Sequence, residues 1–404
     1  MEHLLFLVHR IPYPPNKGDK IRSFHLLKHL AQHYRVHLGT FVDDPADWQH
    51  CDEVRKLCHA SHFANLRPAL ARARSLGAFA GGRPLSLDYY RDAALQAWVE
   101  RTVSGNAIRR TLVFSSAMAQ FVQSRGGSRS VIDFVDIDSD KWLQYADQKL
   151  WPMSWLYRRE GRRLLEHERR TATAFDASLF VSQAEARLFR QLAPESAAKV
   201  DYFNNGVDTD YFSPDRDYPN PYAPGEKAIV FTGAMDYWPN VDAVQWFARE
   251  IFPAILERDP RALFCIVGAR PTDQVRQLAG RKGVRVTGSV PDVRPYVAHA
   301  QVAVAPLRIA RGIQNKVLEA MAMARTVVVS PQALEGIDAA PGSELLLAET
   351  AAQYASAILG RLGQAGEAIG PTARRKVIDR YNWDDNLAKV GSLLERGLRS
   401  GAGA

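Results

Sequence analysis

The residues that could do chemistry are most concentrated in the stretch RGIQNKVLEAMA, residues 311–322. Gly312 ends a loop that also carries Arg308 and Arg311, and the apolar spacing predicts a helix from about Ile313. The first N–H groups of a helix have no partner inside it, and the helix dipole places positive charge at the same end. The stretch is therefore a candidate anion site, of the kind that holds a phosphate group. A plain buried helix is the alternative, because the apolar residues fit it equally well.

Two charged residues lie on one side of this predicted helix. Lys316 falls in the first turn, where a cation is unfavourable beside the dipole unless an anion neutralises both. Glu319 follows three residues later, so the two side chains are neighbours on the helix surface. We expect Lys316 to face a phosphate group and Glu319 to accept hydrogen bonds from two hydroxyl groups of a ribose. The alternative is a surface ion pair, which stabilises a helix by roughly a few tenths of a kcal/mol.

Two glycine-containing turns follow predicted strands. Gly233, in FTGAMDYW, would let backbone N–H groups approach a phosphate, although a tight turn between strand and helix explains it too. Val290, in VTGSVPD, would lie at the carboxyl end of a strand, where main-chain groups can read a flat heterocycle. Neither a G-x-G-x-x-G nor a G-x-x-x-x-G-K-[ST] pattern occurs in the sequence, so neither a dehydrogenase nor a P-loop protein is supported.

The elements that must position these residues are parallel strands separated by helices. A chain of 404 residues is too long for one core, so we expect two domains. Apolar, β-branched runs alternate with helical patterns, as in parallel sheets covered by helices. The predicted strands are 4–9, 35–42, 111–116, 130–136, 177–182, 228–233, 262–268, 284–290, 302–307 and 326–330. The stretch between the two sets is rich in Asn, Asp, Pro and Gly and is predicted as a linker.

Charge and composition exclude several classes of protein. The net charge of +8 is spread evenly over both halves, which suits an anionic ligand or an anionic membrane surface. It is too even for a dedicated nucleic-acid-binding domain, so no nucleic-acid partner is expected. The longest apolar runs are too short to span a bilayer, and MEHLLFLVHR has no basic segment ahead of its apolar part. We therefore expect a cytoplasmic protein.

The cysteines and neighbouring histidines predict neither disulfides nor a metal site. Three cysteines cannot form a disulfide framework in a chain of this size. Cys51 and Cys58 lie among His50, His59 and His62, but their spacing matches no zinc pattern that ligand geometry justifies. We expect no bound metal.

Six segments, in this order, resemble the C-terminal domain of the family 4 glycosyltransferases. They are FTGAM, FCIVGARP, VTGSVPDVRPY, VAVAPLR, GIQNKVLEAMA and ALEGI. The linker segment YFNNGVDTDYFSP is similar to the N-G-V-D segment between the domains of that family, and the likeness extends over essentially the whole chain. In the first half, HRIPYPPNKGDKIRSF and DFVDIDSDKW resemble the exosortase (PEP-CTERM)-associated sugar transferases of exopolysaccharide assembly.

This resemblance implies the GT-B fold, in which two Rossmann-like, doubly wound parallel-sheet domains face each other across a cleft. The implied acceptor-binding domain spans residues 1–205, and the implied linker spans 206–227. The nucleotide-sugar-binding domain would span 228–380, and a C-terminal helix within 381–404 would cross back to the first domain.

The resemblance also implies roles for particular residues of the second domain. The base of a nucleotide sugar would contact the backbone near Val290, and its ribose would contact Glu319. Its diphosphate would contact Gly233 and the helix that begins after Gly312, at Ile313. Such enzymes work without a metal and mostly with retention, so cations and dipoles must stabilise the leaving diphosphate. Our candidates are Lys316, Arg308 and Arg311, in that order, and no cofactor is expected.

Gly18, in the first domain, would let that domain close on the phosphate and the sugar.

The sequence departs from the family pattern in three places. Arg311 stands where many members have a glutamate, and the loop AMDYWPN lacks the Arg and Lys that many members carry there. Asp136 stands where many have a histidine. It would position the sugar or act as a general base, or it would only help to cap the helix that follows.

The function implied is a hexosyl-type glycosyltransferase that uses a nucleotide sugar and a saccharide or polyprenyl-linked acceptor, in exopolysaccharide or surface-glycan biosynthesis. A non-hydrolysing nucleotide-sugar 2-epimerase and a non-catalytic nucleotide-sugar-binding partner are the alternatives. The arginine-rich stretch 155–170, with Trp151 and Trp155, would rest on the inner face of an anionic membrane, or it is simply a solvated helix face.

Overall fold

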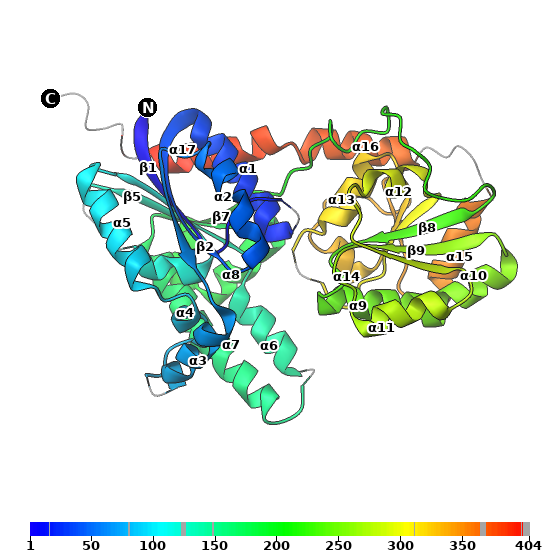
Figure 1. Ribbon diagram of the computed structural model, residues 1–404, viewed down its shortest axis with the longest axis horizontal. Helices are drawn as coiled ribbons and strands as arrows, with labels where there is room; N and C mark the ends of the chain where they lie inside the picture. The colour runs from blue at the N-terminus through cyan, green and yellow to red at the C-terminus, as the bar shows by residue number, and fades with distance from the viewer. Residues whose placement is uncertain are drawn as a thin grey trace. The chain divides into compact units, whose positions relative to one another are not determined.

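The computed structural model describes residues 1–404 except 16, 80, 123–126, 148, 311, 364–368, 397 and 399–404. This described part forms two compact units. The first contains Met1–Asn204 and the described residues from Asp384 on, and the second contains Asn205–Trp383. Each unit is a parallel sheet with helices packed around it (Figure 1). The predicted class of two Rossmann-like parallel-sheet units is confirmed.

The sheet of the first unit has seven strands within the described residues, in the order β3-β2-β1-β4-β5-β6-β7. All neighbours are parallel, and Leu4–Val8 of β1 are buried because β1 lies inside the sheet. The strands are β1 (Glu2–Val8), β2 (Tyr34–Val42), β3 (Ala60–Asn65), β4 (Arg110–Phe114), β5 (Arg129–Val135), β6 (Ala177–Phe180) and β7 (Val200–Tyr202).

The helices of the first unit connect these strands, and one more follows from the end of the chain. They are α1 (Gly18–His33), α2 (Cys51–Arg55), α3 (Pro68–Ser75), α4 (Leu85–Tyr89), α5 (Ala93–Gly105), α6 (Asp138–Asp147), α7 (Met153–Ala174), α8 (Gln183–Leu192) and α17 (Trp383–Glu395). Short 3₁₀ turns lie at Pro45–His50, Leu76–Phe79, Ser116–Phe121 and Pro194–Lys199. Apart from Trp383, α17 belongs to this unit.

The sheet of the second unit has six strands in the described part of the chain, in the order β10-β9-β8-β11-β12-β13. They are β8 (Lys227–Thr232), β9 (Ala262–Val267), β10 (Val284–Gly288), β11 (Val302–Ala305), β12 (Val327–Val329) and β13 (Leu346–Leu347). The helices are α9 (Trp238–Trp246), α10 (Phe252–Arg258), α11 (Asp273–Arg276), α12 (Arg294–His299), α13 (Asn315–Ala322), α14 (Pro331–Leu334), α15 (Ala351–Leu362) and α16 (Ile369–Arg380), with a π-helical turn at Phe247–Ile251 and a 3₁₀ turn at Gln277–Gly280.

The segment predicted as a linker, residues 206–227, has no helix or strand before Lys227 and lies within the second unit. It packs on that unit through specific contacts. The hydroxyl of Tyr222 donates to the carbonyl of Tyr296 at 2.8 Å, and the Arg294 guanidinium stacks 3.7 Å from the ring of Tyr211. The Asn/Asp/Pro/Gly composition therefore produces an irregular segment that is held in place by side chains.

The order of the strands changes direction once in each sheet. In the second unit the chain runs outward from β8 through β9 to β10, and then from β11 outward through β12 to β13 on the other side. Ligands of open parallel sheets bind at such a switch point, beyond the carboxyl ends of the strands. The loops after β8 and β11 are therefore where a ligand site is expected.

Two glycines allow the loops after β8 and β9 to approach each other at the carboxyl ends of these strands. Gly268 follows β9 with a φ of 159°, and a Cβ built on it would lie 1.6 Å from the carbonyl oxygen of Gly233. The Gly233 N–H in turn donates to the carbonyl of Val267 at 3.0 Å. Only glycine at 268 lets the two loops approach this closely.

Gly268→Ala is expected to destabilise the second unit by about 1–3 kcal/mol, because the new methyl group forces the Gly233 loop away. Gly280→Ala is the matched control, since a Cβ there meets nothing within 4 Å, and its effect should stay within about 0.5 kcal/mol. Urea unfolding of the two variants measures the difference. Equal midpoints would show that the glycine contact does not constrain the loop.

Candidate functional site

The loops after β8 and β11 bring two of the predicted residues together. A Cβ on Gly233 would lie 3.3 Å from Cε of Lys316 and 2.8 Å from Nδ2 of Asn240. Gly233 follows β8, whereas Lys316 is the second residue of α13, which the chain reaches after β11. Two residues that were predicted separately, Gly233 and Lys316, are therefore adjacent in space.

The loop before α13 is shaped by two glycines. Gly312 has a φ of 63°, in the left-handed region, and a Cβ on Gly336 would lie only 2.6 Å from the Gly312 carbonyl oxygen. Ile313 is buried beneath the loop, so the chain enters the helix in a fixed direction. Gln314 stands at the N-cap position and its side chain does not cap the helix, which leaves first-turn N–H groups for a ligand. Arg311 lies outside the described residues.

Lys316 carries a charge that the protein only partly satisfies. Its Nζ donates to Oδ1 of Asn240 at 2.9 Å and lies 5.1 Å from the centre of the Phe231 ring. Asn240 is neutral, so it fixes the ammonium group without cancelling its charge. Burial lowers the pKa of Lys316 to about 8, and the nearby Glu319 carboxylate opposes this shift in part. An anion at this place would favour the protonated form.

Glu319 is the complementary case. Burial raises the pKa of its carboxyl group to about 7, and the positive charge of Lys316 opposes that shift only in part. Among the described residues, no hydrogen bond or ion pair reaches the carboxylate. Buried carboxylates without a partner are costly. A carboxylate left without a partner is suited to accept hydrogen bonds from the hydroxyl groups of a ligand.

Arg308, in contrast, already has an anionic partner. Its Nε donates to Oδ2 of Asp242 at 2.9 Å, and a second guanidinium nitrogen donates to the other carboxylate oxygen. Its guanidinium also lies 5.7 Å from the ring of Trp246. The side chain is half exposed and is directed onto α9, so the structure ties Arg308 to that helix.

Val290 lies two residues beyond Gly288, the last residue of β10, and is partly buried. Gly288 has a φ of 71°, which turns the chain sharply at the carboxyl end of the strand. The backbone at Val290 is therefore at the same edge of the sheet as Gly233, although β9 separates the two strands.

The remaining predicted residues, Gly18 and Asp136, belong to the first unit. Gly18 is exposed and is the first residue of α1. Asp136 follows β5, and its carboxylate accepts a hydrogen bond from Nζ of Lys141 at 2.6 Å. Asp136 is thus partnered with a side chain of α6, and among the described residues no backbone N–H of α6 donates to its carboxylate.

Strained backbone marks this edge of the first unit. Ser115 and Val135, which come directly after β4 and at the end of β5, have φ values of 81° and 70°. A β-branched residue such as Val rarely adopts this conformation, and such outliers gather where a site constrains the chain. The strain supports a functional edge at these two strands.

A buried ion pair at the same edge was missed in the sequence analysis. Arg22 of α1 and Asp133 of β5 are both fully buried, and Nε donates to Oδ2 at 2.7 Å. The Arg22 guanidinium also stacks 3.5 Å from the Phe203 ring and donates to the Phe203 carbonyl. The signal in the sequence is an aspartate inside the apolar strand SVIDFV, where an unpaired carboxylate would be prohibitive.

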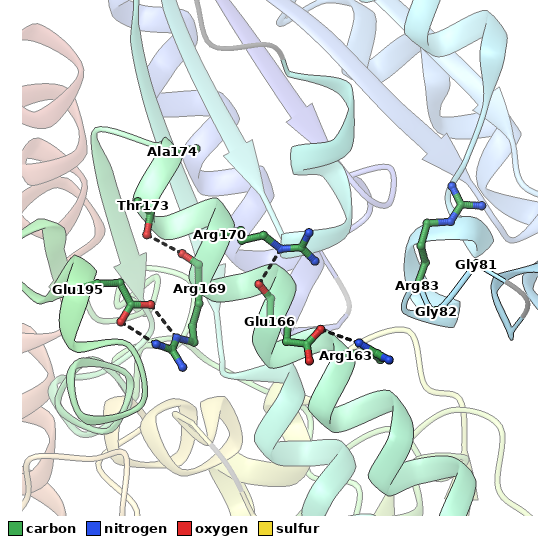
Figure 2. A pocket seen from close by; sticks show the side chains of 10 residues that line it. All are labelled: Gly81, Gly82, Arg83, Arg163, Glu166, Arg169, Arg170, Thr173, Ala174 and Glu195. Carbon is green, nitrogen blue, oxygen red and sulfur yellow. Dashed lines mark hydrogen bonds and ion pairs between the residues drawn. The ribbon is translucent and has the colours of Figure 1, made fainter.

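The arginine-rich stretch lines a wide depression of ≈ 730 Å³ in the first unit (Figure 2). Arg163, Arg169 and Arg170 project from α7, and Arg83 approaches from a separate segment. Arg163 pairs with Glu166 at 2.9 Å, and Arg169 pairs with Glu195 at 2.6 Å. The depression is basic, open and distinct from the residues around Lys316.

Within the described residues, no helix is both long enough and apolar enough to cross a membrane.

The second unit is similar in sequence to a known protein family. Residues 226–364 match the family model described as glycosyl transferases group 1. No curated protein matches the chain.

Solved structures resemble the fold over almost the full chain. Sucrose-phosphate synthase from Thermosynechococcus elongatus has a TM-score of 0.70 at 17% identity and covers 99% of this chain and 100% of its own. HepE from Anabaena, solved with UDP, has a TM-score of 0.66 at 14% identity, and the match covers 98% of this chain and 100% of HepE. A UDP-forming α,α-trehalose-phosphate synthase from Burkholderia xenovorans has a TM-score of 0.62 at 14% identity, and the match covers 98% of this chain and 99% of the synthase.

Residues 226–364, which hold Gly233, Lys316 and Glu319, thus match the glycosyl transferases group 1, and the chain as a whole has the GT-B fold of two Rossmann-like units.

Proposed function

We propose that this protein is a metal-independent, hexosyl-type glycosyltransferase that transfers a sugar from a nucleotide sugar, with retention, to a saccharide or polyprenyl-linked saccharide acceptor. The observation that carries the proposal is the pair of Lys316 and Glu319. Each balances part of the other's charge, and no other charged group among the described residues pairs with either of them. Lys316 lies beside the backbone of Gly233, and both Lys316 and Glu319 belong to the region that matches the glycosyl transferases group 1. HepE, which has a similar fold, has been solved with UDP and with UDP-glucose, and this supports a UDP-sugar as the first donor class to test.

The proposed chemistry depends on fixed positive charge at the leaving diphosphate. Lys316 and the uncapped N–H groups of α13 stabilise the negative charge that develops as the bond to the sugar breaks. Glu319 holds the ribose and the backbone near Val290 meets the base. Arg308 assists only if the diphosphate competes with Asp242 for its guanidinium, so we rank it after Lys316.

In the first unit, we propose that Gly18 lets the backbone approach the phosphate and the sugar, and that Asp136 orients the sugar or the acceptor. Nζ of Lys141 lies 2.6 Å from the Asp136 carboxylate, and a carboxylate held in one position by a neighbouring side chain is suited to an orienting role.

A peripheral contact with an anionic membrane in exopolysaccharide or surface-glycan assembly completes the proposal. Leu150 and Trp151, which precede α7, are 89% and 79% exposed, and Trp155 is 55% exposed. Trp155 stacks on Phe79 with ring centres 6.3 Å apart, and Arg159 lies 4.6 Å above the Phe79 ring. Exposed tryptophans beside arginines are typical of surfaces that rest in the headgroup region of a bilayer.

A panel of UDP-, GDP-, dTDP- and ADP-sugars tests donor binding directly, because a ligand that binds the native state raises the unfolding temperature. A product assay with and without acceptor then distinguishes the transferase from a 2-epimerase, which would convert the donor with no acceptor present. Transfer that persists in EDTA supports a donor site without metal, and transfer that stops and returns with Mg²⁺ contradicts it.

We expect Glu319→Ala to weaken donor binding by about 10- to 100-fold, since it removes hydrogen bonds to a charged acceptor worth about 1.5–3 kcal/mol. Lys316→Ala should instead lower kcat by roughly 10²–10³, because its charge matters most in the transition state. Calorimetry and steady-state kinetics measure the two effects. The exposed Lys282→Ala serves as the control on the same unit, and unchanged constants in both site variants would refute the assignment.

Donor affinity should pass through a maximum between about pH 7 and pH 8, the pKa values of Glu319 and Lys316 in the free protein. Below that range Glu319 is protonated and loses acceptor capacity, and above it Lys316 loses its charge. The two limbs belong to the pair, because the groups interact. Binding of UDP-glucose across this range measures the profile.

Lys316→Arg should remove the alkaline fall, because an arginine stays charged, and Glu319→Gln should remove the acid one. A flat profile in the unsubstituted protein would contradict the proposal.

Trp151→Ala with Trp155→Ala should reduce cosedimentation with vesicles of anionic phospholipid by at least about tenfold, since two interfacial aromatic anchors are lost. Vesicles of neutral phospholipid provide the comparison, and the exposed Trp48→Ala provides the matched variant. Binding that is equal for all three proteins would exclude this surface as the membrane contact.

A further inference from the structure

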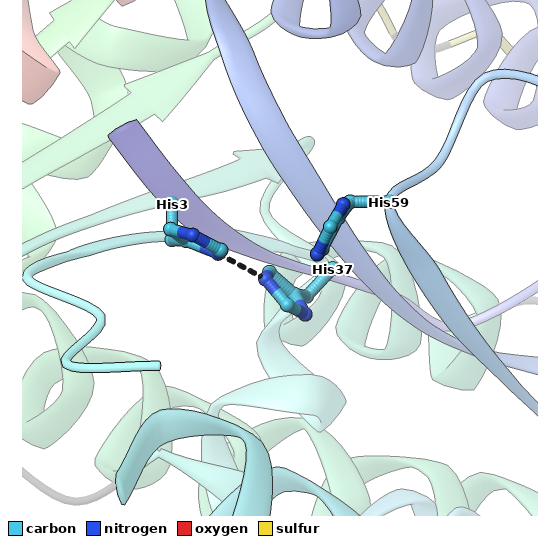
Figure 3. A group of neighbouring side chains, drawn as sticks. All are labelled: His3, His37 and His59. Atoms are coloured by element: carbon cyan, nitrogen blue, oxygen red, sulfur yellow. Dashed lines mark hydrogen bonds between the residues drawn. The ribbon is translucent and has the colours of Figure 1, made fainter. Parts of the chain in front are cut away.

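Three histidines from separate segments of the first unit meet at one edge of its sheet (Figure 3). His3 is in β1, His37 is in β2, and His59 directly precedes β3. One ring nitrogen from each lies within 4.8 Å of the other two. In the described part of the chain, no other group of three or more His, Cys, Asp or Glu side chains has the spacing of metal ligands.

The backbone fixes the positions of these histidines. In the parallel register, His3 is opposite Arg35 and His37 is opposite Ala60. The N–H of His59 donates to the carbonyl of Val36 at 2.8 Å, which anchors the residue before β3 to β2. Because strand neighbours are held by the ladder, the three side chains are brought together before any ligand binds.

The rings already face each other through nitrogen atoms. Nδ1 of His3 and Nε2 of His37 are 2.7 Å apart, a hydrogen bond that needs one shared proton. His59 stands edge-on to both rings, with centres 5.3 and 5.2 Å away. Nδ1 of His37 is buried and has no hydrogen-bond partner among the described residues, although buried polar atoms are nearly always satisfied.

We propose that His3, His37 and His59 bind a divalent transition-metal cation of the Zn²⁺ class through three imidazole nitrogens, with the fourth position open to water. Zn²⁺ takes imidazole ligands at about 2.0–2.1 Å in a tetrahedral arrangement, and small ring rotations bring nitrogens now within 4.8 Å of one another to that geometry. Imidazole suits Zn²⁺, Cu²⁺ and Ni²⁺, whereas Mg²⁺ and Ca²⁺ require oxygen ligands, which this cluster lacks among the described residues.

The charges around the cluster are the remaining constraint on cation binding. The N-terminal amine is one opposing charge, and Arg35, which is opposite His3 in the register, is the other. Its side chain is exposed and can extend into water, so its repulsion of a bound cation is screened.

The place of the cluster in the sheet separates it from the residues of the proposed function in the first unit. His3 is the second residue of β1, at the amino end of the strand, whereas Gly18 and Asp136 follow the carboxyl ends of β1 and β5. A metal here joins three strands, including the edge strand β3, whose residues are only partly buried. The metal is therefore independent of the proposed donor site.

Titration of the EDTA-treated full-length chain with ZnCl₂ tests the proposal by calorimetry and by unfolding temperature. One equivalent should bind and raise the unfolding temperature, since the metal binds the folded sheet. Co²⁺ should give the visible spectrum of a four-coordinate site with nitrogen ligands, and MgCl₂ should give no effect.

His59→Gln and His37→Gln should each weaken Zn²⁺ binding at least about tenfold. His59 is exposed, so its variant keeps the fold intact and remains informative if the buried His37 variant does not fold.

A control comes from a second histidine pair. His29 and His33 of α1 are four residues apart with ring centres at 4.9 Å, a possible two-ligand site. The double variant His29→Gln, His33→Gln should bind Zn²⁺ as the unsubstituted chain does. The proposal is overturned if no saturable equivalent binds, or if binding survives His59→Gln and is lost in the double variant.

Discussion

The second unit depends on the close approach of two backbone loops at the carboxyl edge of its sheet. The carbonyl of Gly233 lies where a side chain on Gly268 would have to be, so no other residue at 268 leaves both loops in place. Gly233 in turn has no room for a side chain beside Asn240 and Lys316. The edge therefore presents main chain instead of side chains, and the Lys316 stem packs directly on it. This packing buries the ammonium group and so sets its acidity.

Charged residues at the candidate site fall into two kinds. Among the described residues, Lys316 has a neutral hydrogen-bond partner, and Glu319 has no hydrogen-bond or ion-pair partner. The pKa values of both groups are shifted toward 7. Arg308 and Asp136 are held by opposite charges, Asp242 and Lys141. A group whose charge is already balanced gains less from a ligand than one whose charge is not. This difference is why the proposal gives Lys316 and Glu319 the main roles.

The first unit separates its features by the edge of the sheet. The carboxyl edge has the strained Val135 and the buried Arg22–Asp133 pair, which ties α1 to β5. The amino edge has the histidine cluster. Parallel strands make this separation possible, because all their carboxyl ends lie on one side. The residues proposed to handle the sugar and those proposed to bind a metal therefore lie at opposite ends of one sheet and share no side chain.

The sequence by itself determined the class of fold and the proximity of two candidate site residues. All ten predicted strands are present, because apolar β-branched runs buried on both faces are a strong local signal. Three strands were not predicted: β3 contains Ser, His and Asn, and β7 and β13 have only three and two residues. Lys316 and Glu319 were predictable as neighbours because helix geometry alone relates them. The Arg308–Asp242 pair, the Gly233–Gly268 contact and the three histidines are separated by 66, 35 and up to 56 residues. Only the tertiary structure decided these, since crossover connections bring strands together in an order that no local pattern encodes.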